Sequence, residues 1–330
     1  MQICSASTSA SSRSRTRLSF PLRPRRTLVT ARLLVGAALT VAGFTLVVAC
    51  GGDVETRADL AFVSTRDGDY AIYEMGGDGK GERRLTDHDA DASSPATLFF
   101  QIDPAWSPDG KKIAFSSRRT GSYNLYLMNA EGKGTQRLTS TKADDLHPTW
   151  SPGGQRIAFE RSGDIFVVND DGTGARSVVA SSAEESEPAW SPDGKWIAYV
   201  RRLPDAPVRE VWLMRADGSE RHQLTRQNAV IYTPAWSPDS TRIVFTSKRD
   251  SEVFELYTIG VDGKGLRRVT PTAGDMFEPS WSPDGSKIAF SEDGAIFSVE
   301  LGGGDIDKLT DAENNDSSPA WNPSPPPVEP

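Results

Sequence analysis

The feature that most constrains this chain is a motif of about twelve residues that recurs along it. The first full copy is PAWSPDGKKIAF at 104–115. Each copy contains a Trp, and consecutive copies of this Trp lie 40–46 residues apart. After Trp106 come Trp150, Trp190, Trp236, Trp281 and, in a shortened copy, Trp321. Self-similarity at a nearly fixed period is the sequence signature of a repeat architecture.

Each repeat contains four short β-rich runs bounded by turn residues. The Trp run is followed by an apolar triplet such as 113–115, a second apolar run such as 124–128, and a short run ending in Arg-Leu-Thr or a variant of it. Ser-Pro-Asp-Gly combines a Pro suited to a type I turn with a Gly that accepts a positive φ, so it predicts a hairpin between the first two runs. A turn centred on Asp-Gly predicts a second hairpin, between the third and fourth runs. Four antiparallel strands per repeat are typical of a β-propeller blade.

The two ends of the repeat array predict how the ring closes. The first patterned run begins at Leu60 with no Trp run before it, and the run around Trp321 has no successor. Together they complete one blade. We therefore predict an all-β, six-bladed β-propeller of four-stranded antiparallel blades over residues 60–322, closed by the C-terminal strand around Trp321. Closure removes exposed sheet edges, and the Pro-rich residues 323–330 are expected to be a disordered tail.

The first 50 residues do not resemble the repeats. They contain seven Arg and no acidic residue, and an apolar run of 17 residues extends from Leu33 to Ala49. A charged region followed by an apolar region is typical of a signal peptide. The run ends in Val-Val-Ala-Cys, which resembles a bacterial lipobox and implies cleavage before Cys50 and its lipidation. We expect a lipoprotein signal peptide at 1–49 and a lipidated Cys50 with a short tether at 50–59; the alternative is an uncleaved membrane helix.

Charge and cysteine content limit the partners of the exported chain. Cys4 and Cys50 are the two cysteines, so no disulfide is expected in the mature protein. The chain has 37 Lys and Arg against 45 Asp and Glu, and because seven of the basic residues precede Cys50, the mature part would carry a net charge near −15. Such a surface repels nucleic acid and anionic lipid headgroups. We expect a monomer held at the membrane by its lipid, on the periplasmic or extracellular side of the cell envelope.

The patterns PxWSPDGxxIAF, IYxM and RLT resemble the WD-like repeats of the TolB propeller family, the periplasmic component of the Tol-Pal envelope system. The resemblance covers residues 60–322. It implies a non-catalytic binding or scaffold module of the envelope, with a Pal-like lipoprotein among its partners. The same repeats occur in the propellers of prolyl-oligopeptidase-like and tricorn-like peptidases. TolB carries an α/β domain ahead of its propeller, where this sequence has the nine residues 51–59, and TolB is soluble.

Length variation between the repeats predicts two different faces. From the end of the RLT run to the next Trp is 11 residues in five repeats but 20 in the first, and the other variation falls between the second and third runs. In a propeller these two sets of loops emerge on one face, which we call the variable face. The Ser-Pro-Asp-Gly and Asp-Gly turns form the opposite, constant face. We expect the partner to bind the variable face, and the tether before Leu60 to hold the constant face toward the membrane.

Two groups of candidate partner-binding residues lie on the variable face. The insertion at 87–103 contributes acidic residues and the apolar residues that often mark a partner contact, although these could instead fold over a blade edge: Asp87, Asp89, Asp91, Leu98, Phe99, Phe100. A second group directly precedes the Pro before a motif Trp and should surround the channel mouth: Asp103, His147, Glu187, Glu278. That group could hold a cation or a basic partner segment. The alternative is pairing between these carboxylates and nearby arginines that ties neighbouring blades together: Arg66, Arg118, Arg161, Arg201, Arg249.

Catalytic and cofactor motifs are scarce in this sequence. Asp87, Asp89 and Asp91 have the spacing of a calcium loop, but Ala92 and Leu98 stand where that loop needs Gly and Glu, so no metal site is predicted. There is no G-x-S-x-G elbow and no phosphate-binding loop. We predict no enzyme, no catalytic residue and no cofactor, and we interpret the motif Trp residues as core between blades. The alternative is a lyase or hydrolase using a channel-mouth metal with His147, or a protein that binds a small molecule or cation at the mouth.

Overall fold

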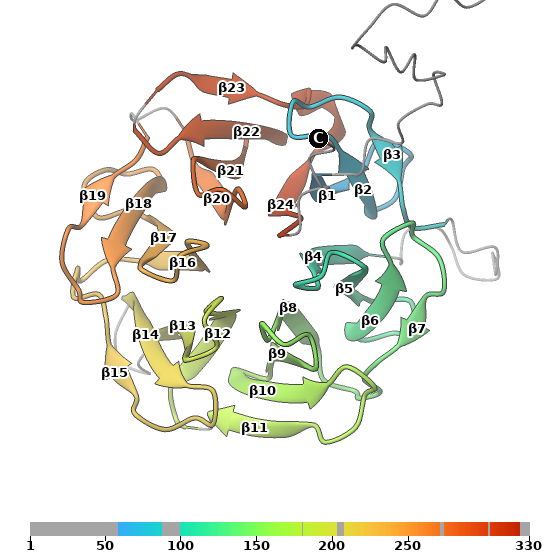
Figure 1. Cartoon of the computed structure of the whole chain (residues 1–330), viewed down its shortest axis with the longest axis horizontal. Coiled ribbons are helices and arrows are strands. Elements are labelled where there is room, and N and C mark those ends of the chain that lie inside the picture. Colours follow the sequence, from blue (N-terminus) through green and yellow to red (C-terminus); the bar gives the residue numbers. More distant parts are fainter. Residues whose placement is uncertain are drawn as a thin grey trace, which may run out of the picture. The chain divides into compact units, whose positions relative to one another are not determined.

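The computed structural model describes residues 59–87, 100–179, 181–202, 208–270, 274–302 and 304–323. These residues form six four-stranded antiparallel sheets arranged around a central axis (Figure 1). The predicted all-β, six-bladed propeller is confirmed. No helix in the described ranges is long and apolar enough to cross a membrane. The predicted signal peptide, the lipidation site Cys50, most of the tether and the tail from residue 324 lie outside the described residues.

Each blade runs from an innermost to an outermost strand. Blade 1 comprises β24 (Ser317–Trp321), β1 (Leu60–Ser64), β2 (Ala71–Met75) and β3 (Arg83–Arg84). Blade 2 comprises β4 (Gln101–Trp106), β5 (Lys112–Ser117), β6 (Asn124–Asn129) and β7 (Gln136–Arg137). Blade 3 comprises β8 (Asp145–Trp150), β9 (Arg156–Arg161), β10 (Asp164–Asn169) and β11 (Arg176–Val179). Blade 4 comprises β12 (Glu184–Trp190), β13 (Trp196–Arg202), β14 (Arg209–Arg215) and β15 (His222–Gln223). Blade 5 comprises β16 (Ile231–Trp236), β17 (Arg242–Ser247), β18 (Glu255–Gly260) and β19 (Arg267–Arg268). Blade 6 comprises β20 (Met276–Trp281), β21 (Lys287–Glu292), β22 (Ala295–Glu300) and β23 (Ile306–Lys308), followed by a short 3-10 helix at Ala312–Asn314.

The ring closes as the sequence predicted. Strand β24, from the C-terminal end, is the innermost strand of blade 1 and pairs antiparallel with β1, with Leu60 opposite Trp321 and Ala61 opposite Ala320 (Figure 1). The backbone N–H of Asn322 also donates to the carbonyl of Asp59, at 2.8 Å. The two ends of the described propeller are therefore joined within one sheet.

The motif Trp residues lie between blades. In four junctions the indole Nε1 of the Trp donates to a backbone carbonyl of the preceding blade. The acceptor is the residue just before that blade's own motif Trp, for example Ala320 for Trp106 at 3.1 Å and Ala105 for Trp150 at 3.0 Å. At the other two junctions that neighbour is Thr149 or Ser280, and its hydroxyl accepts instead from the backbone N–H of Trp190 or Trp321. This agrees with their interpretation as core between blades.

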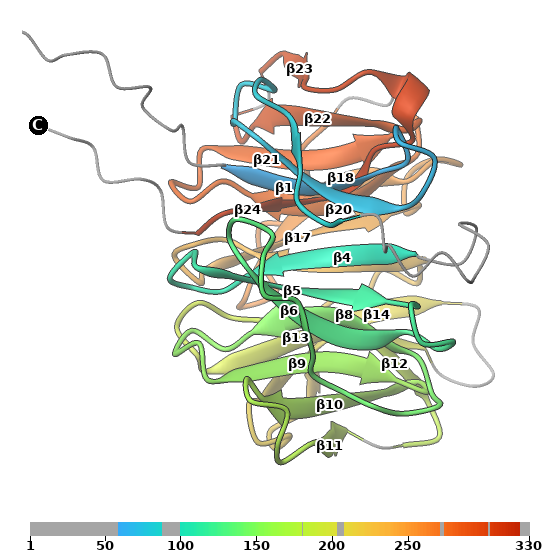
Figure 2. The ribbon, with the colours of Figure 1, turned by 90° about the vertical axis from the view of Figure 1, so that its right-hand side faces the viewer.

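The loops separate onto two faces. On the variable face, loops between second and third strands bond to segments between fourth and first strands: the backbone N–H of Tyr123 donates to the Asp144 carboxylate and that of Met276 to the Phe254 carbonyl. On the constant face, the two kinds of tight turn bond to each other, as in the bond from Val261 to Thr241. Figure 2 shows the blades edge-on, with turns at the opposite ends of the strands.

The Trp junctions supply a matched test of what holds the ring together. We expect Trp106→Phe to lower the free energy of unfolding by about 1 kcal/mol more than Trp190→Phe, because the first change removes the indole hydrogen bond to the Ala320 carbonyl. The indole N–H of Trp190 has no partner in the described part of the chain, so its replacement removes no hydrogen bond. Urea unfolding of both variants measures the difference; equal losses would contradict this role of the indole bond.

Candidate functional site at the channel mouth

The channel mouth is lined by six residue-proline pairs, one from the innermost strand of each blade. They enclose a cavity of about 170 Å³. Sequence analysis identified four of the six residues and missed Thr233 and Ser318, although both also directly precede the Pro of their motif copies. We call the six residues the mouth ring: Asp103, His147, Glu187, Thr233, Glu278 and Ser318.

Every member of the mouth ring has a positive φ, between 49° and 55°. This left-handed conformation is uncommon for residues other than Gly. In each blade it coincides with a shift in register between the innermost strand and its neighbour, for example between Ile102 and Ala105. A β-bulge of this kind re-aims a side chain out of the regular alternation of the strand. The strain is therefore repeated in all six blades at the position that lines the channel.

The mouth-ring carboxylates bond to the backbone of the next blade. The Asp103 carboxylate accepts from the backbone N–H of His147 at 3.2 Å, and the Glu187 carboxylate accepts from that of Thr233. Glu278 accepts from both the backbone N–H and the hydroxyl of Ser318, at 2.6 and 2.9 Å. Acidic and non-acidic residues thus alternate around the mouth, and three of the six junctions carry a carboxylate-to-backbone bond.

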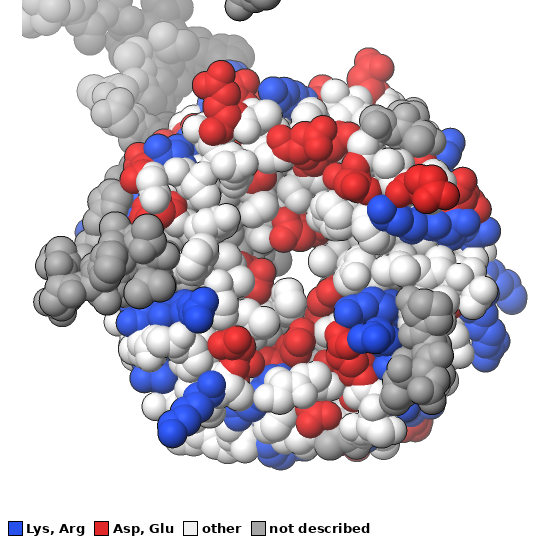
Figure 3. Space-filling model, turned by 180° about the vertical axis from the view of Figure 1, so that it is seen from behind, with Lys and Arg blue, Asp and Glu red and all other residues white. Residues whose placement is uncertain are grey.

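His147 is surrounded by carboxylates. Its Nδ1 lies 3.2 Å from Oε2 of Glu160, and its Nε2 lies 3.9 Å from Oδ2 of Asp103. Burial by itself favours the neutral ring, but Asp103, Glu160 and Glu187 outweigh it and raise the pKa of His147 to about 10. Burial also raises the pKa of Glu187, against the opposing effect of His147. The mouth therefore carries one imidazolium among several carboxylates, and Figure 3 shows acidic side chains around the central opening.

The interpretation that the arginines tie the mouth-ring carboxylates of neighbouring blades together is wrong. Arg161 pairs with Asp145 at 2.6 Å, Arg201 with Glu185 at 3.3 Å, and Arg66 with Asp316 at 3.1 Å. In each pair the carboxylate lies two residues before the mouth ring and belongs to the same blade. Side chains alternate between the two faces of a strand, and the β-bulge interrupts this alternation. The mouth-ring residue and the carboxylate two residues before it therefore have different partners.

The remaining predicted residues fall in or beside the insertion. The ring of Phe100 packs against that of Tyr70 from blade 1, with centroids 4.7 Å apart, and Tyr70 is itself 39% exposed. This contact favours the alternative in which the end of the insertion folds over a blade edge. Asp87 is exposed. Asp89, Asp91, Leu98 and Phe99 lie outside the described residues.

The geometry argues against a metal held by His147. Within the described ranges, no group of three or more His, Cys, Asp or Glu side chains is arranged to hold a metal ion. The charges of the mouth are better suited to a cationic group of a partner.

Comparison with known families agrees with the fold. The family described as the TolB beta propeller domain (PD40) matches residues 96–203 and 161–326. The chain belongs to the TolB β-propeller family. This membership supports a general binding or scaffold role for the propeller.

Relatives of this TolB-like propeller match over short segments. The Tol-Pal system protein TolB of Desulfosudis oleivorans is 35% identical over 85 residues, which is 26% of this chain and 17% of the relative. That of Syntrophus aciditrophicus is 32% identical over 94 residues, covering 27% and 19%. The aligned parts thus span less than a fifth of these relatives. Their names assign both relatives to the Tol-Pal system.

Solved structures show the same fold at low identity. TolB from Acinetobacter baumannii has a TM-score of 0.67 at 19% identity, covering 81% of this chain and 67% of that one. An oligogalacturonate lyase in complex with manganese has a TM-score of 0.50 at 17% identity, covering 76% and 73%. At such identities the likeness concerns the fold alone.

The protonated His147 gives a pH prediction. Its folded pKa lies above the ordinary value of 6.5, so its stabilising effect is complete below about pH 6.5 and is lost as the pH rises toward 10. The side chain is 34% exposed, and after solvent screening we expect a loss on the order of 2 kcal/mol. Urea unfolding between pH 6 and 10 should show a shallower fall for His147→Gln than for the wild type. His222→Gln, on the exposed outer strand of blade 4, is the control; parallel curves for the wild type and His147→Gln would contradict the prediction.

Proposed function

We propose that this protein is a non-catalytic binding module, lipid-anchored in the bacterial cell envelope, that contacts a protein partner through the variable face and the channel mouth. The observation that carries the proposal is the mouth ring, in which three carboxylates alternate with non-acidic residues around one opening. Their backbone bonds fix the carboxylates before any partner arrives, so little side-chain entropy is lost on binding. Such a ring suits a Lys or Arg side chain, or a basic segment, of the partner.

The Tol-Pal relatives make a Pal-like lipoprotein the first partner to test. Electrostatic complementarity of this kind steers the encounter and selects the partner. Because the partner would bring the positive charge to a protein of acidic composition, binding should weaken as salt is added. The relatives match this chain over short segments, so the partner belongs to the proposal alone.

Neutralising the mouth ring tests the proposed interaction. We expect the triple variant Asp103→Asn, Glu187→Gln, Glu278→Gln to bind a Pal-like lipoprotein of the same cell at least about tenfold more weakly, because it loses the charge while each amide oxygen can still accept the backbone bond. The matched control removes three exposed carboxylates from the constant face: Asp78→Asn, Asp171→Asn, Asp217→Asn. Affinity capture from envelope extracts, followed by titration of the captured partner, gives the comparison. Equal binding by the two triple variants would count against the mouth as the contact.

The proposed anchor is consistent with the start of the propeller. The Asp59 carboxylate accepts from the backbone N–H of Gly77 at 3.0 Å, and Gly77 belongs to a tight turn of the constant face. A tether of nine residues spans at most about 30 Å. We propose that it holds the constant face toward the membrane and leaves the variable face open to the partner.

The anchor itself is tested by Cys50. We expect cells grown with labelled palmitate to incorporate the label into the wild type and not into Cys50→Ser, because the Cys50 sulfur is the atom to which the lipid is attached in the proposed modification. Cys4→Ser is the control and should keep the label. Label retained by Cys50→Ser would exclude this residue as the anchor, and a mature chain still carrying residues 1–49 would favour the uncleaved membrane helix.

A further inference from the structure

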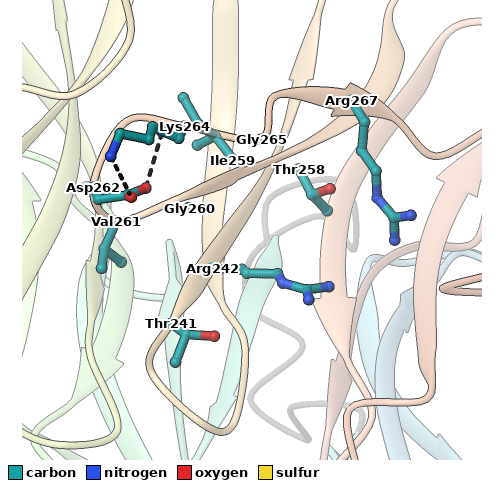
Figure 4. Close-up of a pocket in the computed structure, with 10 residues that line it drawn as sticks. All are labelled: Thr241, Arg242, Thr258, Ile259, Gly260, Val261, Asp262, Lys264, Gly265 and Arg267. Atoms are coloured by element: carbon teal, nitrogen blue, oxygen red, sulfur yellow. Dashed lines mark hydrogen bonds and ion pairs between the residues drawn. The ribbon is translucent and has the colours of Figure 1, made fainter.

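A second polar site lies at the outer rim of blade 5, away from the channel mouth. A groove of about 560 Å³ is formed at the constant-face ends of β17, β18 and β19. Arg242 begins β17 and Arg267 begins β19, while Thr258 lies on β18 between them. Figure 4 shows both guanidinium groups and the Thr258 hydroxyl directed toward the same space. Three hydrogen-bond donors from three adjacent strands thus meet in one groove.

The register explains why these side chains meet. Arg242 is opposite Gly260, and Thr258 is opposite both Val244 and Arg267. Because side chains alternate across a strand, all of these positions share one face of the sheet. Gly260, opposite Arg242, adds no side chain at that point, and the Asp262 carboxylate, which is paired with Lys264, lies beside it.

Asp239 interacts electrostatically with Arg242 but does not form an ion pair with it. Within the described part of the chain, neither Arg242 nor Arg267 forms an ion pair. Arg267 donates one bond, from Nη2 to the Leu301 carbonyl of blade 6 at 2.8 Å, which positions its guanidinium and leaves further N–H groups available. The neighbouring Lys264 is paired with Asp262 at 3.6 Å.

Thr258 adds an independent observation. Its side chain lies on the same face of the sheet as those of the two arginines. Its hydroxyl is directed into the groove beside them, where it can donate a hydrogen bond to a bound acceptor (Figure 4).

The equivalent positions in other blades are neutral or occupied. In blade 6 they hold Lys287 and Asp307, which pair with each other at 3.5 Å. In blade 1 Arg83 pairs with Glu74 at 2.5 Å. Blade 3 also has two arginines, but there Arg156 stacks on Trp190, at 5.2 Å, and apolar Val167 replaces Thr258. Among the described residues, blade 5 alone combines two arginines that form no ion pair with a hydroxyl between them.

We propose that the blade 5 groove binds a phosphate group, either free phosphate or the phosphate of a lipid headgroup. Guanidinium groups recognise phosphate through paired, charge-assisted hydrogen bonds. A tetrahedral oxyanion offers oxygens in several directions and can engage donors from three strands, whereas a planar carboxylate is satisfied by one guanidinium fork. This site is separate from the mouth ring and does not rest on the proposed partner.

The experiment is calorimetric titration of the full chain with inorganic phosphate at low ionic strength. We expect saturable binding that Arg242→Gln, Arg267→Gln together weaken at least about tenfold. The matched control, Arg176→Gln with Lys287→Gln, removes the same charge at equivalent positions of blades 3 and 6 and should bind as the wild type does. Thr258→Val should also weaken binding, because it removes the hydroxyl that lies between the two arginines.

The ligand series distinguishes the source of the phosphate. Binding of glycerophosphoglycerol, the deacylated headgroup of phosphatidylglycerol, as strong as that of inorganic phosphate would assign the groove to a lipid headgroup. Binding of inorganic phosphate alone would assign it to free phosphate. The proposal is overturned if the wild type binds neither ligand, if acetate binds more tightly than phosphate, or if the blade 5 double variant binds as well as its control.

Discussion

The structure depends on contact between neighbouring blades, because one four-stranded sheet cannot bury both of its faces alone. The triplet strands are completely buried, as at Ile113 and Phe115, and their shielding comes from the adjacent blades. The motif Trp joins each blade to the preceding one through either its indole or its backbone N–H. The bond between Trp106 and Ala320 belongs to this series and crosses the junction of the first and last repeats. Closure therefore uses the same interaction as every other junction, with β24 completing the sheet.

This repeated junction also determines where chemical variety is tolerated. Five copies of the RLT run place a Thr whose hydroxyl accepts a backbone N–H 14 positions earlier, as Thr86 does from Ile72 and Thr225 from Val211. The hydroxyls of these Thr residues already form hydrogen bonds within the blade. The mouth ring is different: its backbone conformation is the same in every blade, but its side chains are acidic, basic or neutral. A fixed conformation with varied side chains is what a binding site built on a repeat scaffold requires.

The fold could be predicted well because the same pattern of β-rich runs and turns recurs in six repeats. Turn residues, strand order, ring closure and the location of the mouth all followed from matching copies. The interactions between particular side chains could not be predicted from these copies. The sequence does not show that Asp145 and the mouth-ring residue two positions later have different partners, since the β-bulge that separates those partners is set by the backbone. Thr233 and Ser318 were not predicted because they carry no ionisable group, although their position before Pro is visible in the sequence.

Length variation drew the sequence interpretation to the variable face, and the blade 5 groove shows the limit of that criterion. The groove lies among turns of constant length, so no insertion marks it. It differs from its counterparts only in the identity of side chains at register-equivalent positions: Thr258 where blade 3 has Val167, and Arg267 where blade 6 has Asp307. Those equivalences come from strand pairing, which the sequence does not give directly. In a propeller, loop length identifies where a partner has room to bind, whereas side-chain identity at equivalent positions identifies where a small ligand finds donors.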